Sequence, residues 1–104
     1  MSQLEGLLAC EKARARTFTP AEIAWCEARG ESAGAAFARL FAAKEALIKA
    51  MRAPEGRFCA IEIVHDADGA PSARWSKLPE HGEVSISMAY SHPFAIATVA
   101  VAWR

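Results

Sequence analysis

The sequence predicts an α+β fold in which one long helix packs on a face of an antiparallel sheet. Between residues 32 and 51, apolar side chains recur at three- and four-residue spacing, which is typical of an amphipathic helix. From residue 58 onward the spacing becomes two, as expected for strands with one buried face. A helical first half followed by consecutive antiparallel strands indicates the α+β class.

Two shorter helices are expected ahead of the long one. Residues 4–15 form a helix candidate with a basic end. A second helix should begin after Thr19, which suits the N-cap, with Pro20 in the first turn, and should end near Gly30. Glu22 stands three residues after the cap, as a capping box requires, so we expect it to cap the helix rather than to bind a ligand.

The long helix carries a lysine, Lys44, on its apolar side. We expect this helix to begin at Ser32 or Gly34 and to run to about Met51, because the segment Ala-Pro-Glu-Gly at 53–56 stops it. A lysine among core residues must find an anionic partner, extend its ammonium outward, or lose its charge. The expected buried side comprises Phe37, Leu40, Phe41, Lys44, Leu47, Ile48 and Met51.

The second half is expected to form two pairs of strands. The turn 66–71, Asp-Ala-Asp-Gly-Ala-Pro, joins the first pair. In this turn Gly69 can adopt a positive φ, and Pro71 fixes φ where the next strand opens. A polar loop at 77–82 leads to the second pair. The expected strands are Phe58–His65, Ser72–Trp75, Val84–Met88 and Phe94–Trp103.

Length and composition indicate a single domain, 1–104. The chain of 104 residues is 53% hydrophobic, enough to build a core. Twelve basic and twelve acidic side chains cancel, which argues against a nucleic-acid binder. The N-terminus shows neither a signal-peptide pattern nor a membrane span. The 3 cysteines are widely spaced and match no zinc pattern, so a cytoplasmic protein with reduced thiols is expected.

The charges of the long helix suggest a ligand site. Glu45 and Lys49 are four residues apart, so they share one helix face and can form an ion pair or converge on one ligand. A carboxylate beside two cations, here Lys44 and Lys49, suits a divalent metal ion and a phosphorylated ligand. The alternative is a surface ion pair beside a lysine that extends outward.

Several short segments, taken in order, carry a resemblance to a known family. Together they resemble the holo-acyl-carrier-protein synthases, the short class of 4′-phosphopantetheinyl transferases, over residues 17–101. The motif on the long helix is specific, whereas the other segments are weak singly. The segments are Phe18–Ile23 followed by Cys26, Phe41–Ala46 with Lys49 and Ala50, Ile61–Ile63, Gly69–Pro71 and Ala95–Val99.

The resemblance implies an activity, a cofactor and partners. Such enzymes transfer the 4′-phosphopantetheine arm of coenzyme A to a serine of an acyl carrier protein, with Mg²⁺. They are generally homotrimers with active sites between subunits. The resemblance does not distinguish fatty acid biosynthesis from secondary metabolism. Because the chemistry is phosphoryl transfer, positioning and charge neutralisation should supply most of the catalysis.

The resemblance also implies roles for individual residues. Glu45 would be a Mg²⁺ ligand, and Lys49 would contact the coenzyme A phosphates or act as the base for the carrier serine. Lys44 would face those phosphates or support the site. The turn with Gly69 and Pro71 would lie near the nucleotide, although both residues have a simpler role in the turn itself.

Three departures from the family pattern leave the site incomplete. The family's N-terminal Ile-Gly-x-Asp strand, whose aspartate is the second Mg²⁺ ligand, has no counterpart here. If that strand belongs to the sheet, its loss would expose an edge for self-association or a partner strand. The possible substitute carboxylates, none in a matching context, are Glu5, Asp66 and Asp68.

The other two departures concern a cation and a histidine. The family arginine thought to bind the 3′-phosphate falls at Leu40, and Arg39 is one residue away, about 100° around the helix. The Ser91-His92 motif lies two residues ahead of the Ala95–Ala97 strand instead of four. We therefore expect His92 to be either a nucleotide contact or a loop histidine with no catalytic task.

Two functions remain open at this point, beside the alternative of an unrelated α+β domain in which the Glu45 and Lys49 pair is only structural. The first is an active, Mg²⁺-dependent transferase that modifies carrier proteins. The second is a non-catalytic relative that binds coenzyme A or a carrier protein, or acts through a partner chain. An acidic carrier protein calls for a basic face, for which the available side chains are Lys12, Arg14, Arg16, Arg29 and Arg39.

Overall fold

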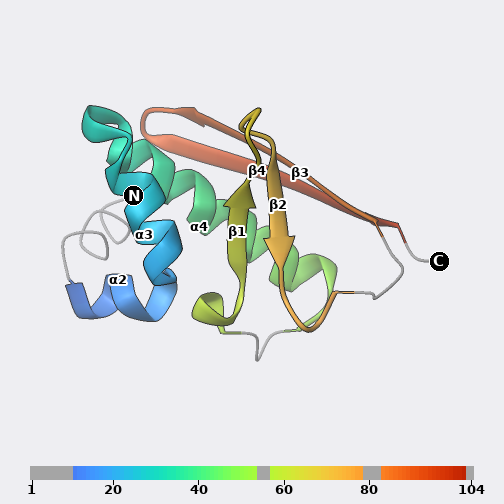
Figure 1. Ribbon diagram of the computed structural model, residues 1–104. Helices are drawn as coiled ribbons and strands as arrows, with labels where there is room; N and C mark the ends of the chain where they lie inside the picture. The colour runs from blue at the N-terminus through green and yellow to red at the C-terminus, as the bar shows by residue number, and fades with distance from the viewer. Residues whose placement is uncertain (1–10, 54–56, 79–82, 103–104) are drawn as a thin grey trace.

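One long helix, α4 (Ala33–Ala50), forms the centre of the fold. The computed structural model describes residues 11–53, 57–78 and 83–102. Within these ranges two short helices precede α4 and two β-hairpins follow it, so the α+β class is confirmed (Figure 1). The helices are α2 (Glu11–Thr17), α3 (Pro20–Glu27) and α4, with 3₁₀ turns η1 (Gly30–Ser32) and η2 (Phe58–Ala60).

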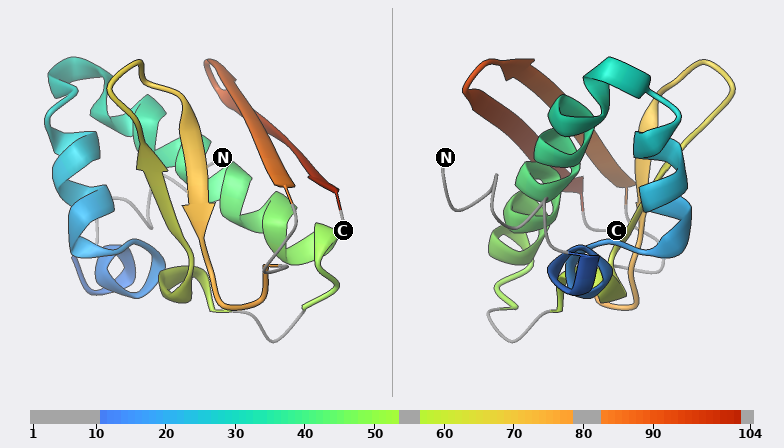
Figure 2. Two further views of the ribbon diagram at one scale, coloured as in Figure 1. Left: turned by 45° about the vertical axis from the view of Figure 1, so that its right-hand side comes forward. Right: turned by 90° about the vertical axis from the view of Figure 1, so that its left-hand side faces the viewer.

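The strands are arranged as two antiparallel hairpins. In the described residues β1 (Glu62–His65) pairs with β2 (Pro71–Arg74), and β3 (Glu83–Ser91) pairs with β4 (Phe94–Ala102). Helix α4 runs between them: α3 and the β1–β2 hairpin lie on one side and the β3–β4 hairpin on the other (Figure 2). The helix therefore packs on an antiparallel sheet as predicted, with a second hairpin covering its other side.

The start of α3 follows the predicted capping box. Thr19 is the N-cap, with φ −74° and ψ 159°, and its hydroxyl accepts a hydrogen bond from the Glu22 backbone N–H at 3.2 Å. The Glu22 carboxylate accepts from the Thr19 N–H at 2.8 Å, which completes the box. The helix ends at Glu27, and the chain turns at Gly30, where φ is +61°. Of the predicted helix 4–15, residues 4–10 lie outside the described residues.

Two predicted strand boundaries were wrong. The strand expected from Phe58 begins only at Glu62, because the N–H groups of Ala60 and Ile61 bond back to Arg57 and Phe58 and close the turn η2. Strand β3 is longer than expected and reaches Ser91, because Ser91 pairs with Phe94 across a tight turn. Trp103 lies outside the described residues.

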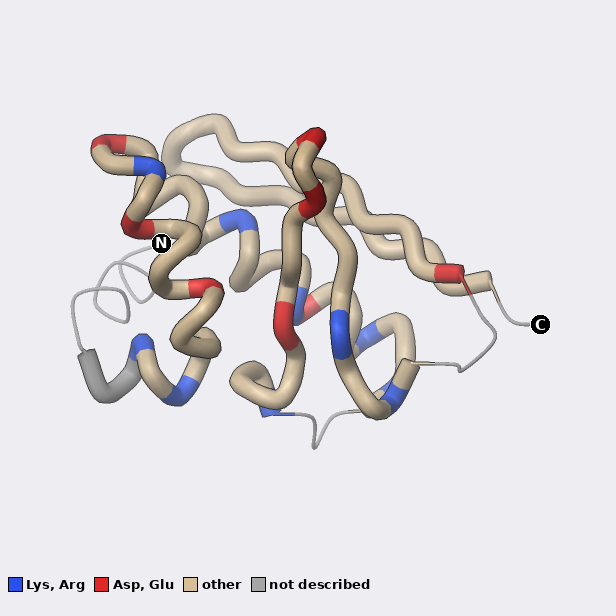
Figure 3. The backbone as a smooth tube through the Cα atoms, viewed as in Figure 1, with Lys and Arg blue, Asp and Glu red and all other residues tan. Residues whose placement is uncertain are grey.

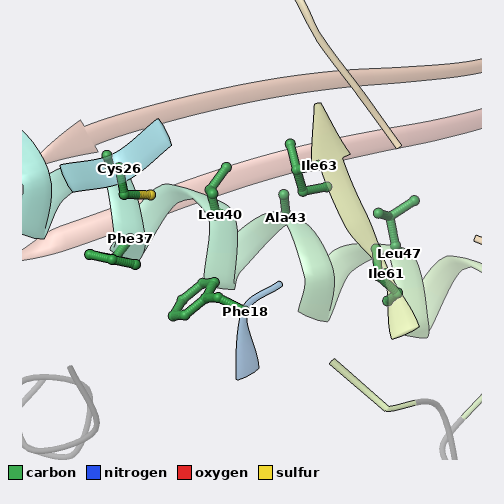
Figure 4. Close-up of a cluster of buried hydrophobic side chains, with 9 residues drawn as sticks. Phe18, Cys26, Phe37, Leu40, Ala43, Leu47, Ile61 and Ile63 are labelled. Atoms are coloured by element: carbon green, nitrogen blue, oxygen red, sulfur yellow. The ribbon is translucent and has the colours of Figure 1, made fainter. Parts of the chain in front are cut away.

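The core forms along the predicted apolar side of α4. Phe37, Leu40 and Leu47 are buried as expected, whereas Phe41, Ile48 and Met51 are only half-buried. The side chains of the core come from α4, from the chain around α3 and from η2–β1 (Figure 4). This cluster consists of Phe18, Cys26, Ala36, Phe37, Leu40, Ala43, Leu47, Ile61 and Ile63.

Charge is distributed evenly over the described residues. Acidic and basic positions are interspersed along the chain, with several basic positions spaced along α4 (Figure 3). Within the described ranges no helix is both long and apolar enough to cross a membrane. A ligand site in the described residues must therefore be formed by a local group of side chains rather than by a broad surface of one charge.

Candidate functional site

Lys44 is fully buried and ion-paired with Glu22. The Nζ atom of Lys44 lies 2.5 Å from Glu22 Oε1, and neither side chain is accessible to solvent. The same ammonium donates to the Thr17 carbonyl at 2.8 Å and to the Phe58 carbonyl at 2.9 Å. Of the three possibilities the sequence left open, Lys44 has therefore taken the anionic partner.

The buried pair joins several elements of the fold. Glu22 Oε2 accepts a hydrogen bond from the Ile63 N–H at 2.7 Å, so the carboxylate binds β1 as well as capping α3. Burial lowers the pKa of Lys44, while the hydrogen bond and charge of Glu22 oppose that change. The ammonium uses its three N–H donors on protein acceptors, which leaves none for a phosphate.

Glu45 and Lys49 project from a solvent-exposed side of α4. Both side chains are exposed. Within the described part of the chain neither forms an ion pair with the other or with a third residue. The surface ion pair that the sequence allowed is thus absent, and both charges are available to a ligand.

The turn between β1 and β2 borders an open hollow. Gly69, with φ +84°, and Pro71 both line this hollow of about 480 Å³. Asp66 holds the turn, because its Oδ1 accepts from the N–H groups of Asp68 (2.8 Å) and Ala70 (2.9 Å). The hollow is lined by Trp25, Arg29, Arg39, His65, Gly69, Pro71, Ile86, Ser87 and Met88.

The hollow has a cationic and aromatic wall. The rings of Trp25 and His65 stack with centroids 3.7 Å apart and planes 3° apart. The Arg29 guanidinium lies over the indole, 4.6 Å from its centroid. Burial lowers the pKa of His65, and the charges of Arg29 and Arg39 lower it further, against the opposing effect of Asp66.

From the sequence, Arg39 was identified only as the neighbour of the family arginine position, at Leu40, and as part of a possible basic face. Leu40, at the position of the family arginine, is fully buried in the core. The rotation of about 100° per residue turns Arg39 away from that core, and Arg39 lines the hollow with Gly69 and Pro71. The sequence did not predict that Arg39 would lie in a hollow beside the β1–β2 turn, because this depends on where that turn lies relative to α4.

His92 lies apart from these groups, at the β3–β4 turn. Its ring is exposed, and its Nδ1 is 2.8 Å from the Tyr90 hydroxyl. His92 is not among the residues that line the hollow. Its predicted contact with the nucleotide stays a prediction.

A metal ion would find one candidate carboxylate on α4. In the described ranges no group of three or more His, Cys, Asp and Glu side chains comes together. Asp66 is engaged in its turn, and Glu5 lies outside the described residues. Within α4 (Ala33–Ala50) Glu45 is the one carboxylate, and a single carboxylate is compatible with a Mg²⁺ ion that is bound mainly by phosphate oxygens and water.

Solved structures of one enzyme class share this fold. The chain is similar to a holo-(acyl-carrier-protein) synthase from Bacillus anthracis in complex with CoA (3′,5′-ADP), with a TM-score of 0.82 and 29% identity over 99% of this chain and 89% of that one. It is also similar to the Helicobacter pylori enzyme in complex with coenzyme A, with a TM-score of 0.76 and 28% identity over 95% and 93%.

Sequence comparisons identify the family. The holo-[acyl-carrier-protein] synthase of Moorella thermoacetica is 40% identical over 97 residues, which cover 84% of this chain and 74% of that protein. The synthase of Anaeromyxobacter sp. (strain K) is 35% identical over 96 residues, which cover 88% and 74%. The sequence profile of the 4′-phosphopantetheinyl transferase superfamily matches residues 5–99, and the chain belongs to that superfamily. The predicted family and the predicted enzyme class are both confirmed.

Proposed function

We propose that this protein transfers the 4′-phosphopantetheine arm of coenzyme A to a serine of an acyl carrier protein in a Mg²⁺-dependent reaction. The observation that carries the proposal is the pair of exposed charges, Glu45 and Lys49, on one side of α4, neither of which forms an ion pair within the described residues. The names of the relatives and the coenzyme A complexes of similar structures support the same activity.

The reaction requires charge neutralisation at a diphosphate. The carrier serine oxygen forms a bond to the phosphorus that bears the pantetheine arm, and the bond from that phosphorus to the nucleotide breaks. The nucleotide leaves with the electron pair, and the serine proton passes to a base. Lys49 is suited to contact the phosphate oxygens and offset the developing charge. Glu45 is suited to bind Mg²⁺, which would supply further neutralisation when bound.

Lys44 has a positioning role in this proposal. Its ammonium is occupied by Glu22 and two backbone carbonyls, so a direct phosphate contact would require it to break buried hydrogen bonds. The pair instead fixes α4 against α3 and β1, which orients the next residue, Glu45, toward solvent. Of the two roles that the resemblance allowed, support of the site fits the geometry better.

The nucleotide of coenzyme A is assigned to the hollow beside the β1–β2 turn. Gly69 and Pro71 line it together with two arginines, which favours an anionic ligand. The turn roles of both residues are compatible with this assignment, because the turn brings backbone close to the ligand without a bulky side chain.

We further propose that the active form is a homo-oligomer, a trimer by resemblance to the family. The outward face of β4 carries two large apolar side chains, Phe94 and Ile96, each 64% exposed. Exposed apolar groups of this size, side by side on one strand face, favour a protein interface. A neighbouring subunit could also supply the groups that complete the site around Glu45.

The test is direct mass spectrometry of an apo acyl carrier protein incubated with this chain, coenzyme A and Mg²⁺. We expect a gain of the phosphopantetheine mass that disappears with EDTA. No gain with several carrier proteins, from a folded chain, would overturn the transferase and favour a non-catalytic relative that binds coenzyme A or a carrier protein.

A further inference from the structure

One buried carboxylate connects the two sides of the proposed site. The helix side consists of the exposed charges Glu45 and Lys49 on α4, and the hairpin side is the turn between β1 and β2. Glu22, on α3, is buried and bonds to both α4 and the hairpin. Its Oε1 accepts from the Lys44 ammonium, and its Oε2 accepts from the Ile63 N–H. A path of buried bonds from one side of the site to the other therefore passes through a single side chain.

The bond to Ile63 holds the β1–β2 hairpin against α3. Strand β1 lies between α3 and β2 (Figure 1), so one of its edges faces α3. The Ile63 N–H donates to Glu22 Oε2 at 2.7 Å, and the neighbouring Glu62 accepts a hydrogen bond from the Thr19 hydroxyl at 2.8 Å. Thr19 and Glu22 are also the two members of the capping box. The start of α3 and the edge of β1 are therefore held together as one unit.

The bond to Lys44 fixes the rotation of α4 about its own axis. The Lys44 ammonium is held by two backbone carbonyls, from α2 and η2, and by the carboxylate of Glu22 on α3. Of these acceptors only Glu22 carries a charge, and its bond is the shortest. Glu45 is the next residue of the helix, so a rotation of α4 that releases Lys44 also moves Glu45. A rotation of about 20° displaces a side-chain group about 5–6 Å from the helix axis by about 2 Å.

A displacement of this size matters for phosphoryl transfer. The chemistry depends on positioning and on charge neutralisation, with little covalent work for the protein to do. A misplacement of about 1 Å can lower the rate of such a reaction about a hundredfold. The carboxylate on α4 and the turn of the hairpin must therefore keep a fixed relation to each other in the reacting complex.

We propose that Glu22 is a positioning residue for the transfer reaction, which holds α4 and the β1–β2 hairpin in the one relative orientation that brings Glu45 to the bound substrate. Glu22 touches neither substrate nor metal ion in this proposal, and it acts through Lys44 and Ile63. The effect on rate rests on the proposed transferase function. The orientation itself depends only on the buried bonds.

Steady-state kinetics of Glu22→Gln tests the effect on the reaction. Glutamine keeps the size of the side chain and one acceptor oxygen, but it leaves the ammonium of Lys44 without its anion. We expect kcat to fall about tenfold to a hundredfold, while KM for coenzyme A changes less than about threefold, because no substrate contact is removed. The comparison is made at a temperature at which urea unfolding shows every protein to be folded.

Glu62→Gln is the matched control for this substitution. It makes the same chemical change one residue from Ile63, and an amide oxygen can still accept the hydrogen bond from the Thr19 hydroxyl. Among the described contacts the Glu62 carboxylate bonds to Thr19 and not to Lys44. Its kcat should therefore stay within about twofold of the wild-type value.

Residual dipolar couplings of the backbone amides test the orientation without metal ion, substrate or turnover. In wild type one alignment should fit the amides of α4 and of the β1–β2 hairpin together. In Glu22→Gln each element should still fit by itself, but the two should no longer fit one common alignment with the wild-type orientation. An ion pair that only adds stability would leave the common fit unchanged in the folded protein.

A neutral double variant keeps the test decisive if Glu22→Gln does not fold. Lys44→Met/Glu22→Gln contains no unpaired buried charge, and it should show the same low kcat and the same change of orientation. Wild-type kcat in either folded variant would overturn the proposal, and so would a fall in kcat without a change of orientation. If wild type itself modifies no carrier protein, the transferase is contradicted, and the dipolar couplings still decide whether Glu22 sets the orientation.

Discussion

Lys44 and Glu22 form an ion pair that is closed to solvent and links α4 to α3 and β1. The geometry is well satisfied, because the ammonium bonds to two carbonyls and the carboxylate accepts three hydrogen bonds, from Lys44, Thr19 and Ile63. Burying two charges has a large desolvation cost, which such a network can offset only when its members remain paired. The pair is thus more important for fixing one arrangement of α4 than for adding stability.

Breaking this pair on one side should destabilise the protein strongly. Lys44→Met leaves the Glu22 carboxylate buried without its cation, and we expect a loss of about 3–5 kcal/mol in the free energy of unfolding. In the double variant Lys44→Met/Glu22→Gln the loss should be smaller than the sum of the two single losses, because no unpaired charge remains. Urea unfolding of the four proteins gives the coupling energy; additive losses would contradict this view.

The sequence predicted those parts of the fold that depend on local pattern. The capping box at Thr19 and the span of α4 were predicted because caps and apolar spacing act within a few residues. The late start of β1 was not predicted, because η2 is stabilised by contacts across the chain: the Phe58 carbonyl accepts from Lys44, and the ring centroids of Phe58 and Phe41 lie 4.9 Å apart. Such contacts carry no signal in the local sequence.

The candidate site likewise has a part that local spacing predicted and a part that only the fold brings together. Glu45 and Lys49 were identified by their spacing on one helix, which α4 preserves. The partner of Lys44 was missed, because Glu22 stands 22 residues away and already had a sufficient role as a cap. Arg39 and His65 come together only because the β1–β2 hairpin folds beside α4, so their proximity could not be read from either segment alone.

The stability of the protein should fall above pH 9 because of Cys26. Burial, followed by the charge of Glu22, raises the pKa of this thiol from 9.0 to about 12. Between these values the unfolded state has lost the proton that the folded state keeps, so stability decreases as pH rises. We expect this group to remove about 1 kcal/mol between pH 8 and pH 10.

A pair of cysteine variants isolates that contribution. In Cys26→Ala the free energy of unfolding should decrease less between pH 8 and pH 10 than in wild type. The loss of the side chain itself lowers the stability by the same amount at every pH, so it does not affect this comparison. Cys59→Ala is the control, because Cys59 is exposed and should leave the decline unchanged. Urea unfolding under reducing conditions, repeated across this pH range, measures the free energy of unfolding of wild type and of both variants. The same decline in all three proteins would show that other groups cause it.

Glu45→Gln should abolish carrier modification and leave the fold intact. Glu45 is exposed and makes no ion pair among the described residues, so its removal should change the free energy of unfolding by less than about 0.5 kcal/mol. If the carboxylate binds the metal ion, the rate should drop by at least about a hundredfold, because oriented charge neutralisation dominates this chemistry. Glu27 is an exposed carboxylate on α3, so Glu27→Gln is the matched control and should retain full activity. Retained activity in Glu45→Gln would remove Glu45 from the site.

Polar substitutions on the outward face of β4 should dissociate the oligomer. Phe94→Ser and Ile96→Thr together remove the two large exposed apolar side chains, while the register of β4 with β3 is set by backbone hydrogen bonds and by the opposite face of the strand. Thr98→Val is the control, because it keeps the same face apolar and should preserve the assembly. Sedimentation equilibrium should give three times the chain mass of 11.2 kDa for wild type and the chain mass itself for the double variant.

If dissociation also abolishes carrier modification while the monomer stays folded, the site around Glu45 depends on a neighbouring subunit. A monomeric wild type with full activity would instead show that one chain is sufficient.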